Sequence, residues 1–224
     1  MIKYETDPKK LRKKAYAYIR EHLSEEQLDQ WSKAEQQIIL RMIYTCGDLS
    51  LIENIQISDN FMEQSLELLD DDYELLCDTE VVIAALKQNL LKHEPVCLIN
   101  KASVISQAKA NKQTRSMVAV DLWGNYLAGS IIVIGNEPTA LFRLMEILEE
   151  NHNDNSEDDD QNKPALIIAT PVGFSGAAEA KDYLWEHHER LGIPCITILG
   201  TRGGGMLAAS ALNTLFKIKQ DKFY

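Results

Sequence analysis

Three apolar runs in the second half of the chain limit the fold more than any other feature. The runs SIIVIG (130–135), PALIIATPVG (164–173) and IPCITILGTRGGG (193–205) each end in glycine and lead into a segment whose apolar residues follow helical spacing. Short runs that are apolar throughout are typical of strands buried on both faces, as in parallel sheets. The alternation of strand and helix predicts an α/β fold, in which a parallel sheet carries helices on both faces.

The first half is predicted to be a helical N-terminal segment that leads into this sheet. Helices are expected over residues 9–23, over a short segment capped by Ser24, from Ser32 with its capping-box partner Glu35 to Gly47, and over 58–70 with Ser58 or Asp59 as the cap. Strands are expected at ELLCD (74–78) and PVCLIN (95–100), and helices at TEVVIAALKQNLL (79–91) and 114–123. Residues 103–113 are compatible with a helix or a polar loop.

Length and composition predict one cytoplasmic domain over residues 1–224. Hydrophobic residues make up 45% of the chain, and yet no apolar run is long enough to span a membrane, so no membrane partner is expected. The four cysteines form no CxxC pair, which predicts buried thiols and no metal site. His187 and His188 are expected to be solvated, and residues 151–163 are expected to form an acidic surface loop.

The net charge of −11 argues against nucleic acid as a partner, because phosphate binding needs a basic face. Seven of the acidic residues lie between Glu149 and Asp160, a stretch without lysine or arginine. The rest of the chain is therefore much less acidic, and an anionic ligand is compatible with it.

The loops that follow the three apolar runs form the candidate binding site. They are 135–139, 170–176 and 200–205, and in a parallel sheet the carboxyl ends of the strands lie at one edge, where ligands bind. Glycines there let the backbone approach a ligand and direct N–H groups at it. The alternative is that these glycines only make tight turns. The chain lacks the glycine pattern of a dinucleotide-binding or phosphate-binding loop and the GxSxG motif of hydrolases.

Three arginines, Arg41, Arg115 and Arg202, each interrupt an apolar or glycine-rich context. A planar guanidinium group is suited to binding carboxylates. For each of the three, an intramolecular salt bridge is the alternative interpretation.

Several segments resemble the precorrin-8X methylmutase family. The clearest are LAGSIIVIGNEPTALFRLMEIL, PALIIATPVGFSGAAEAKDYL and GIPCITILGTRGGGMLAASALNTL, and the resemblance extends upstream through ILRMIYTCGDLS and NKQTRSMVAVDLW. It implies a homodimer with the active site at the interface, a tetrapyrrole (corrinoid) substrate that carries many carboxylates, and no cofactor. The implied reaction moves a methyl group from C-11 to C-12 of precorrin-8X, or of its cobalt form, to give hydrogenobyrinate or cobyrinate.

The resemblance also assigns roles to individual residues. Arg41 and Arg115 match substrate-binding arginines of the family, whereas the catalytic histidine falls at Tyr44 and a substrate-contacting serine falls at Ala15. The expected site therefore has Tyr44 as the catalytic residue. For substrate binding it has Ala15, Arg41, Arg115, Gly135, Asn136, Thr139, Pro171, Gly173, Gly176, Arg202, Gly203 and Gly204.

The presence of Tyr44 at the position of the family's histidine leaves several interpretations open. Tyr44 donates a hydrogen bond that favours the reactive tautomer of the ring, which is the interpretation we prefer, or neighbouring arginines lower its pKa, or it only packs in the core. Three functional hypotheses follow. The chain is an isomerase, a catalytically silent corrinoid-binding or carrier protein, or an unrelated α/β binding protein.

Overall fold

The computed structural model describes residues 2–153 and 163–222. Within these residues the sheet has five strands in the order β1-β5-β4-β3-β2. The strands are β1 Ile55–Ile57, β2 Leu75–Cys77, β3 Ile131–Ile134, β4 Leu166–Ala169 and β5 Cys195–Ile198. Strands β2 to β5 are parallel, as predicted, but β1 pairs antiparallel with β5, so the sheet is mixed rather than wholly parallel.

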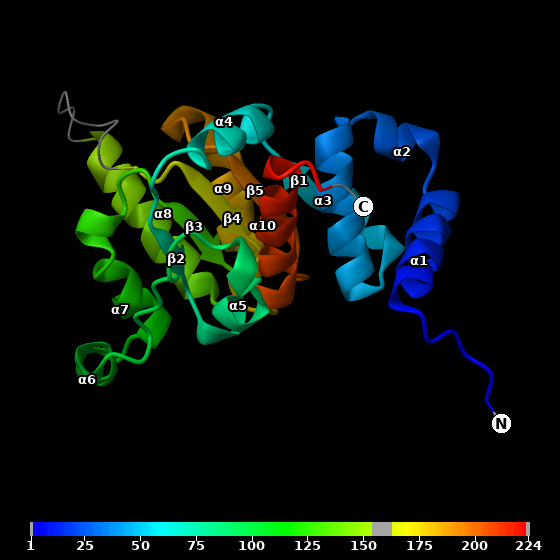
Figure 1. Ribbon diagram of the computed structural model, residues 1–224. Helices are drawn as coiled ribbons and strands as arrows, with labels where there is room; N and C mark the ends of the chain where they lie inside the picture. Colours follow the sequence, from blue (N-terminus) through cyan, green and yellow to red (C-terminus); the bar gives the residue numbers. More distant parts are fainter. Residues whose placement is uncertain (1, 154–162, 223–224) are drawn as a thin grey trace.

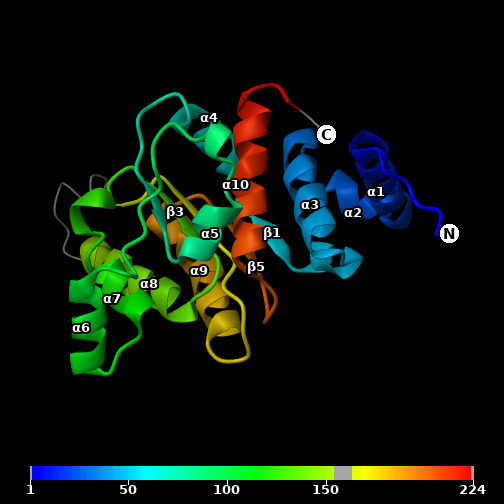
Figure 2. The same cartoon turned by 60° about the horizontal axis from the view of Figure 1, so that its bottom comes forward.

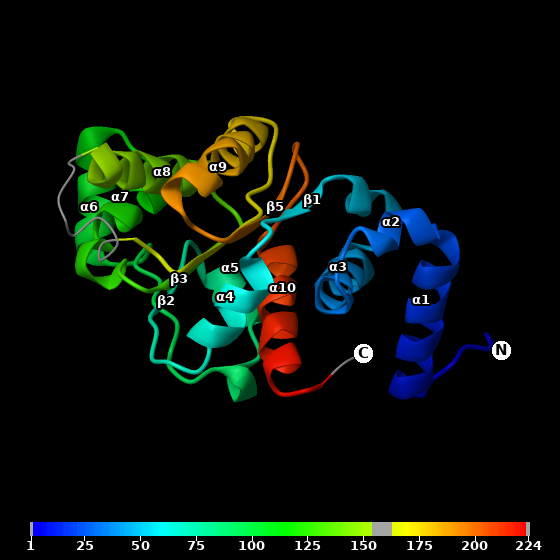
Figure 3. The same cartoon turned by 90° about the horizontal axis from the view of Figure 1, so that it is seen from above.

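Helices cover both faces of the sheet, as Figure 3 shows. Alternate strand residues point to opposite faces: Ile131 and Val133 of β3 lie in one core, and Ile132 and Ile134 lie in the other. The first core is completed by α3 Lys33–Cys46, α4 Phe61–Leu68, α5 Glu80–Ala85 and α10 Gly205–Lys219. The second is completed by α6 Ala102–Asn111, α7 Arg115–Asp121, α8 Pro138–Asn153 and α9 Ala177–Leu191.

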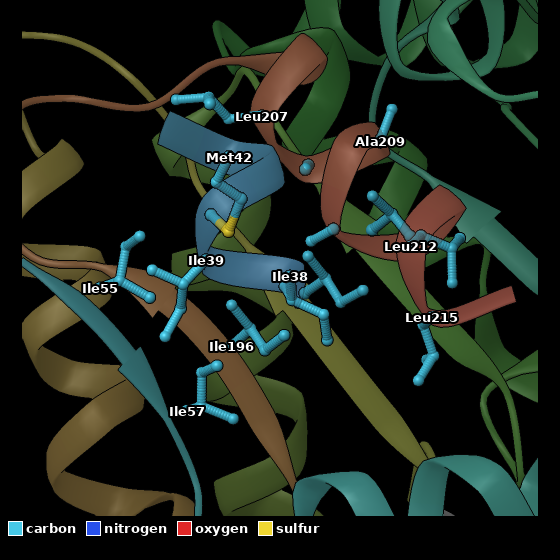
Figure 4. Close-up of a cluster of buried hydrophobic side chains, with 14 of the residues drawn as sticks. Ile38, Ile39, Met42, Ile55, Ile57, Ile196, Leu207, Ala209, Leu212 and Leu215 are labelled. Atoms are coloured by element: carbon cyan, nitrogen blue, oxygen red, sulfur yellow. The ribbon is translucent and has the colours of Figure 1, made fainter. Parts of the chain in front are cut away.

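Helix α10 lies between the sheet and α3 (Figure 2). Figure 4 shows Ile38, Ile39 and Met42 of α3 facing a cluster of apolar side chains from α10, β1 and β5. These side chains are almost completely buried, and together they fix α3 against the sheet through apolar contact. The helix that carries Arg41 and Tyr44 therefore has a defined position.

Two further helices, α1 Pro8–His22 and α2 Glu25–Asp29, precede α3, and α1 packs against α3 at the outside of the molecule (Figure 1). The cap expected at Ser24 and the capping box expected at Ser32 are both present, and Ser24 also forms a capping box, with Gln27. Gly47 ends α3 in the left-handed conformation, with a φ of 70°, and its N–H donates to the carbonyl of Ile43.

Several predictions for the middle of the chain were wrong in part. Neither Ser58 nor Asp59 caps α4, because the Ser58 hydroxyl accepts a hydrogen bond from the N–H of Cys195 instead. The segment 95–100 forms only an isolated parallel bridge between Val96 and Leu76. The helix expected over 79–91 ends at Ala85 and is followed by a 3₁₀ turn, Gln88–Leu90, whereas residues 103–113 are mostly helical.

Other differences concern the surface. An acidic loop was expected over 151–163, but residues 151–153 belong to α8. Residues 154–162 of this prediction lie outside the described residues. His188 is buried rather than solvated, and it stacks on Trp185. Cys46 is exposed, although Cys77 and Cys195 are buried as expected. None of the helices in the described ranges is long and apolar enough to cross a membrane.

Candidate functional site

The loops that follow β3, β4 and β5 meet at the carboxyl edge of the sheet, which confirms their predicted proximity. The N–H of Gly204 donates to the carbonyl of Thr170 at 2.7 Å, and the N–H of Gly173 donates to that of Thr201 at 3.1 Å. A Cβ atom at Gly135 would lie 2.5 Å from the Cα atom of Gly205. The three loops therefore pack directly against one another.

The amides of the β3–α8 loop are held by a buried carboxylate that the sequence analysis did not single out. Asp78, directly after β2, accepts hydrogen bonds from the backbone N–H groups of Gly135, Asn136 and Glu137 at 3.1, 2.8 and 2.9 Å. Its place at a strand end is the signal that could have revealed it. These N–H groups therefore do not face a ligand, contrary to the expectation for this loop.

Further side chains of the same loop also have partners within the protein. The Asn136 amide donates to the Glu137 carboxylate at 2.8 Å. The Thr139 hydroxyl lies 2.7 Å from that of Thr114 and 3.1 Å from that of Ser116. Thr114 and Ser116 flank Arg115, so Thr139 connects this loop to the arginine.

The glycines of the other two loops serve different purposes. At Gly203 a Cβ atom would lie 2.7 Å from the carbonyl oxygen of Pro171 and still closer to that of Thr170, so this glycine is required for close packing. Gly204, with a φ of 127°, and Gly173 have open space beside the Cα atom. Pro171 is buried, whereas the Phe174 side chain is 99% exposed. Of this group, Gly173 and Gly204 are the best placed for close approach of a ligand.

A buried lysine donates a hydrogen bond to the backbone of the β5–α10 loop. Lys181 of α9 is fully buried, and its ammonium group donates to the carbonyl of Arg202 at 2.6 Å. Burial lowers the pKa of Lys181 to about 8, although the nearby Asp182 carboxylate raises it. Lysine side chains are rarely buried, and the helical spacing of residues 177–191 does not indicate that this one is.

We expect Lys181 to make stability depend on pH. Because its pKa is lower in the folded than in the unfolded chain, the unfolded chain binds more protons between pH 8 and 10.5, so stability rises with pH in that window. Between pH 8 and pH 10 the free energy of unfolding of the wild type should rise by about 2 kcal/mol more than that of Lys181→Met.

Urea unfolding at both pH values measures this difference. The comparison isolates Lys181, because the buried thiols Cys77 and Cys195, whose pKa values burial raises, are present in both proteins. Equal pH dependence of the two proteins would contradict the prediction.

The second group of expected site residues lies on α1 and α3. The rings of Tyr44 and Tyr16 are stacked, with centroids 5.3 Å apart, and the guanidinium carbon of Arg41 lies 5.0 Å from the centroid of the Tyr44 ring. Tyr44 is 36% exposed, so it is not a core residue, and Ala15 beside Tyr16 is half-buried. Stacking and the cation–π contact orient the Tyr44 ring at the surface.

Arg41 is one of three cations that interact with Lys217 of α10. The pKa of Lys217 is lowered, first by burial and also by the neighbouring charges of Arg41, Arg12 and Lys222, whereas a hydrogen bond with Lys87 raises it. Arg41, which contacts Tyr44, therefore belongs to a group of cations that interact with Lys217 in an otherwise acidic protein. Arg12 and Lys217 were not among the expected site residues, because only folding brings α1 and α10 to α3.

Arg202 takes part in intramolecular contacts, as the alternative interpretation proposed. Its guanidinium group pairs with Asp48 and also donates to the side chains of Ser50 and Asn54. The pKa of Asp48 is lowered, first by the hydrogen bond from Ser50 and also by Arg202. Arg202 thereby joins the β5–α10 loop to the end of α3.

Arg115 lies on the opposite face of the sheet from Arg41, because α7 and α3 cover different faces (Figure 1). It is exposed, and its side chain donates to that of Asn100 at 3.3 Å. Within one chain the structure therefore brings together Ala15, Arg41 and Tyr44, and it connects Thr139 with Arg115, but it does not unite the two arginines in one pocket.

A cleft of about 410 Å³ lies at the other edge of the sheet, at the start of β5. It is lined by Ser58, Asn60, His188 and their neighbours. This cleft does not coincide with any expected site residue. The described residues contain no cluster of histidine, cysteine or carboxylate side chains suited to a metal ion.

Comparison with known proteins identifies the family. The family model for precorrin-8X methylmutase matches residues 10–218. Two proteins named precorrin-8X methylmutase are 34% identical to the chain: that of Sinorhizobium sp over 95% of both chains, and that of Pseudomonas aeruginosa over 96% of this chain and 98% of its own. The cobalt-precorrin-8 methylmutase of Methanocaldococcus jannaschii is 26% identical over 88% of this chain and 86% of its own.

Solved structures agree with this result. The precorrin-8X methylmutase of Thermus thermophilus superimposes with a TM-score of 0.78 at 25% identity, covering 95% of this chain and 97% of its own. A precorrin-8X methylmutase related protein superimposes with a TM-score of 0.73 at 28% identity, covering 91% and 99%. The fold and the sequence agree over nearly the whole length, and the chain belongs to the precorrin-8X methylmutase family.

Proposed function

We propose that the chain is an isomerase of cobalamin biosynthesis that moves a methyl group from C-11 to C-12 of precorrin-8X or of cobalt-precorrin-8. The observation that carries this proposal is the family match over residues 10–218, together with relatives that are named for this isomerisation. These names favour turnover over silent binding of a corrinoid.

The surface around Tyr44 supports a substrate that carries carboxylates. Arg41 lies over the Tyr44 ring, and Lys217 is close enough to both Arg41 and Arg12 for their charges to interact. Carboxylates bound here relieve the mutual repulsion of these cations and accept hydrogen bonds from them. The basic surface therefore binds the carboxylate side chains at one edge of the corrinoid.

The exposed hydroxyl of Tyr44 then acts as a hydrogen-bond donor to a ring nitrogen of the substrate. In a 1,5-shift the bond between the methyl group and C-11 breaks as the bond to C-12 forms, so the migration itself needs no external base. A phenol hydroxyl is a hydrogen-bond donor, and donation is the only role that this proposal requires of it. A donor that stabilises the reactive tautomer is therefore sufficient.

A homodimer completes the site in this proposal. Arg115 lies on the other face of the sheet from Arg41 and Tyr44 within one chain, and a second copy can place its own Arg115 beside this basic surface. Exposed apolar side chains at the loop edge, Val81, Val172, Phe174 and Met206, support an interface there. Light scattering on the purified protein tests the dimer, and a monomeric mass at assay concentrations contradicts it.

The isomerase reaction is tested by incubating the purified chain with precorrin-8X and, in parallel, with cobalt-precorrin-8, while the visible spectrum is followed. The expected result is conversion of at least one of them to the corrin spectrum. Tight binding without any spectral change at stoichiometric protein overturns the isomerase in favour of a silent binder. Failure to bind any corrinoid points to an unrelated binding protein.

We place the enzyme in the cytoplasm, which its four free thiols support, since disulfides are rare there.

A further inference from the structure

The buried carboxylate of Asp78 has no role in the reaction as described so far. The residue is 2% exposed, and its two oxygens accept four hydrogen bonds: three from the backbone amides of residues 135–137 and one from the hydroxyl of Thr79 at 3.3 Å. Its own N–H donates to the carbonyl of Val133 at 3.2 Å, which extends the pairing of β2 with β3. Asp78 therefore fixes the turn that leads from β3 into α8.

The same turn is connected to the start of α7, where Arg115 lies, by hydrogen bonds between side chains. Helix α8 begins at Pro138, directly after the turn, and Thr139 is its second residue. The Thr139 hydroxyl contacts those of Thr114 and Ser116, and the Thr114 hydroxyl also accepts from the N–H of Met117 as the N-cap of α7. Arg115 is the first residue of α7. The position of the turn thus sets the start of α7 and, with it, the backbone position of Arg115.

We propose that Asp78 is a positioning residue for the substrate: its carboxylate fixes the turn at residues 135–137 and, through Thr139, sets the position of Arg115. The inference rests on the proposed function, in which Arg115 binds a carboxylate of the corrinoid. A carboxylate is required because an asparagine has only one acceptor oxygen, and its NH₂ group would face the backbone N–H groups. At least one amide would lose its partner, and the turn would relax away from its position.

The test is a double-mutant cycle with Asp78→Asn and Arg115→Gln, singly and combined. The measurement is the affinity for hydrogenobyrinate by visible titration, at a temperature where circular dichroism shows every variant folded. Each single change should weaken binding about tenfold, the loss of one well-placed charged contact. The double variant should bind no more weakly than Arg115→Gln alone, because Asp78 acts only through Arg115.

The matched control is Asp121→Asn. Asp121 also joins α7 to α8, through its ion pair with Arg143 at 2.6 Å, and that ion pair does not involve the turn at residues 135–137. This change should lower stability without changing affinity. A loss of affinity in Asp121→Asn equal to that in Asp78→Asn would show a merely structural effect and overturn the proposal.

Other outcomes are equally decisive. Additive losses in the double variant, or full affinity in Asp78→Asn, overturn the positioning role. If Asp78→Asn does not fold, Thr139→Val breaks the next contact without altering the buried carboxylate, and the same non-additivity with Arg115→Gln is expected. A failure of the proposed function is distinguishable. If the wild type binds no hydrogenobyrinate, the inference fails with the function, whereas a wild type that binds without turnover overturns the isomerase and leaves the positioning role to this titration.

Discussion

Replacing Tyr44 with phenylalanine should lower the rate of methyl migration by about a hundredfold, the lower end of what a positioned proton donor contributes. The change removes only the hydroxyl group. Stacking on Tyr16 and the contact with the Arg41 guanidinium involve the ring, so they persist and the substrate still binds. Single-turnover spectra at saturating precorrin-8X measure the rate, and titration with product measures the affinity, which should change by less than about threefold.

The matched control is Tyr18→Phe, because Tyr18 is an exposed tyrosine of α1 that stacks on His22 rather than on Tyr44. This variant should keep the wild-type rate. Tyr44→His restores the residue type that the resemblance assigns to this position, and it should be active, since an imidazole also donates a hydrogen bond. A Tyr44→Phe variant with the full wild-type rate would show that the hydroxyl takes no part in the reaction.

The free energy of unfolding should fall by about 3 kcal/mol in Gly203→Ala, the upper end of the usual cost of inserting a methyl group where there is no room. The new Cβ atom would overlap the backbone carbonyls of Thr170 and Pro171, which no side-chain rotation can relieve. For a chain of 224 residues this corresponds to a fall in Tm of about 6–12 °C. Thermal unfolding followed by circular dichroism measures it.

Gly47→Ala separates this packing effect from the loss of backbone freedom. Gly47 has a φ of 70°, but no atom lies within 4 Å of a Cβ atom built there, so only the left-handed conformation opposes the change. Its cost should be about 1 kcal/mol. If Gly203→Ala costs no more than Gly47→Ala, close packing does not explain Gly203, and the interpretation as a ligand-facing glycine regains its support.

The glycine-rich loops illustrate how far the candidate site could be predicted. Their shared edge follows from the parallel strands, and the sequence was sufficient to place them there. Which amides and glycines stay open was decided by distant residues: Asp78 binds the amides of residues 135–137, and Thr170 excludes any side chain at Gly203. Spacing within one loop contains no information about such partners.

The sequence by itself determined the elements whose signals are local. The apolar runs of β3, β4 and β5, the capping boxes at Ser24 and Ser32, and the glycine that ends α3 depend only on neighbours within a few residues. The family resemblance was also readable from contiguous segments, and the match over residues 10–218 confirms it.

Only the tertiary structure decided the features that depend on residues far apart in the chain. Strand β1 has just three residues and exists because β5 pairs with it, and Arg202 is paired with Asp48 from the other end of the chain. Lys181 is buried because α9 packs over the Arg202 carbonyl. The sheet also separates Arg41 from Arg115, although both interrupt similar sequence patterns. In each case the energy comes from a contact that exists only after the sheet and its two helical layers have assembled, so no local pattern encodes it.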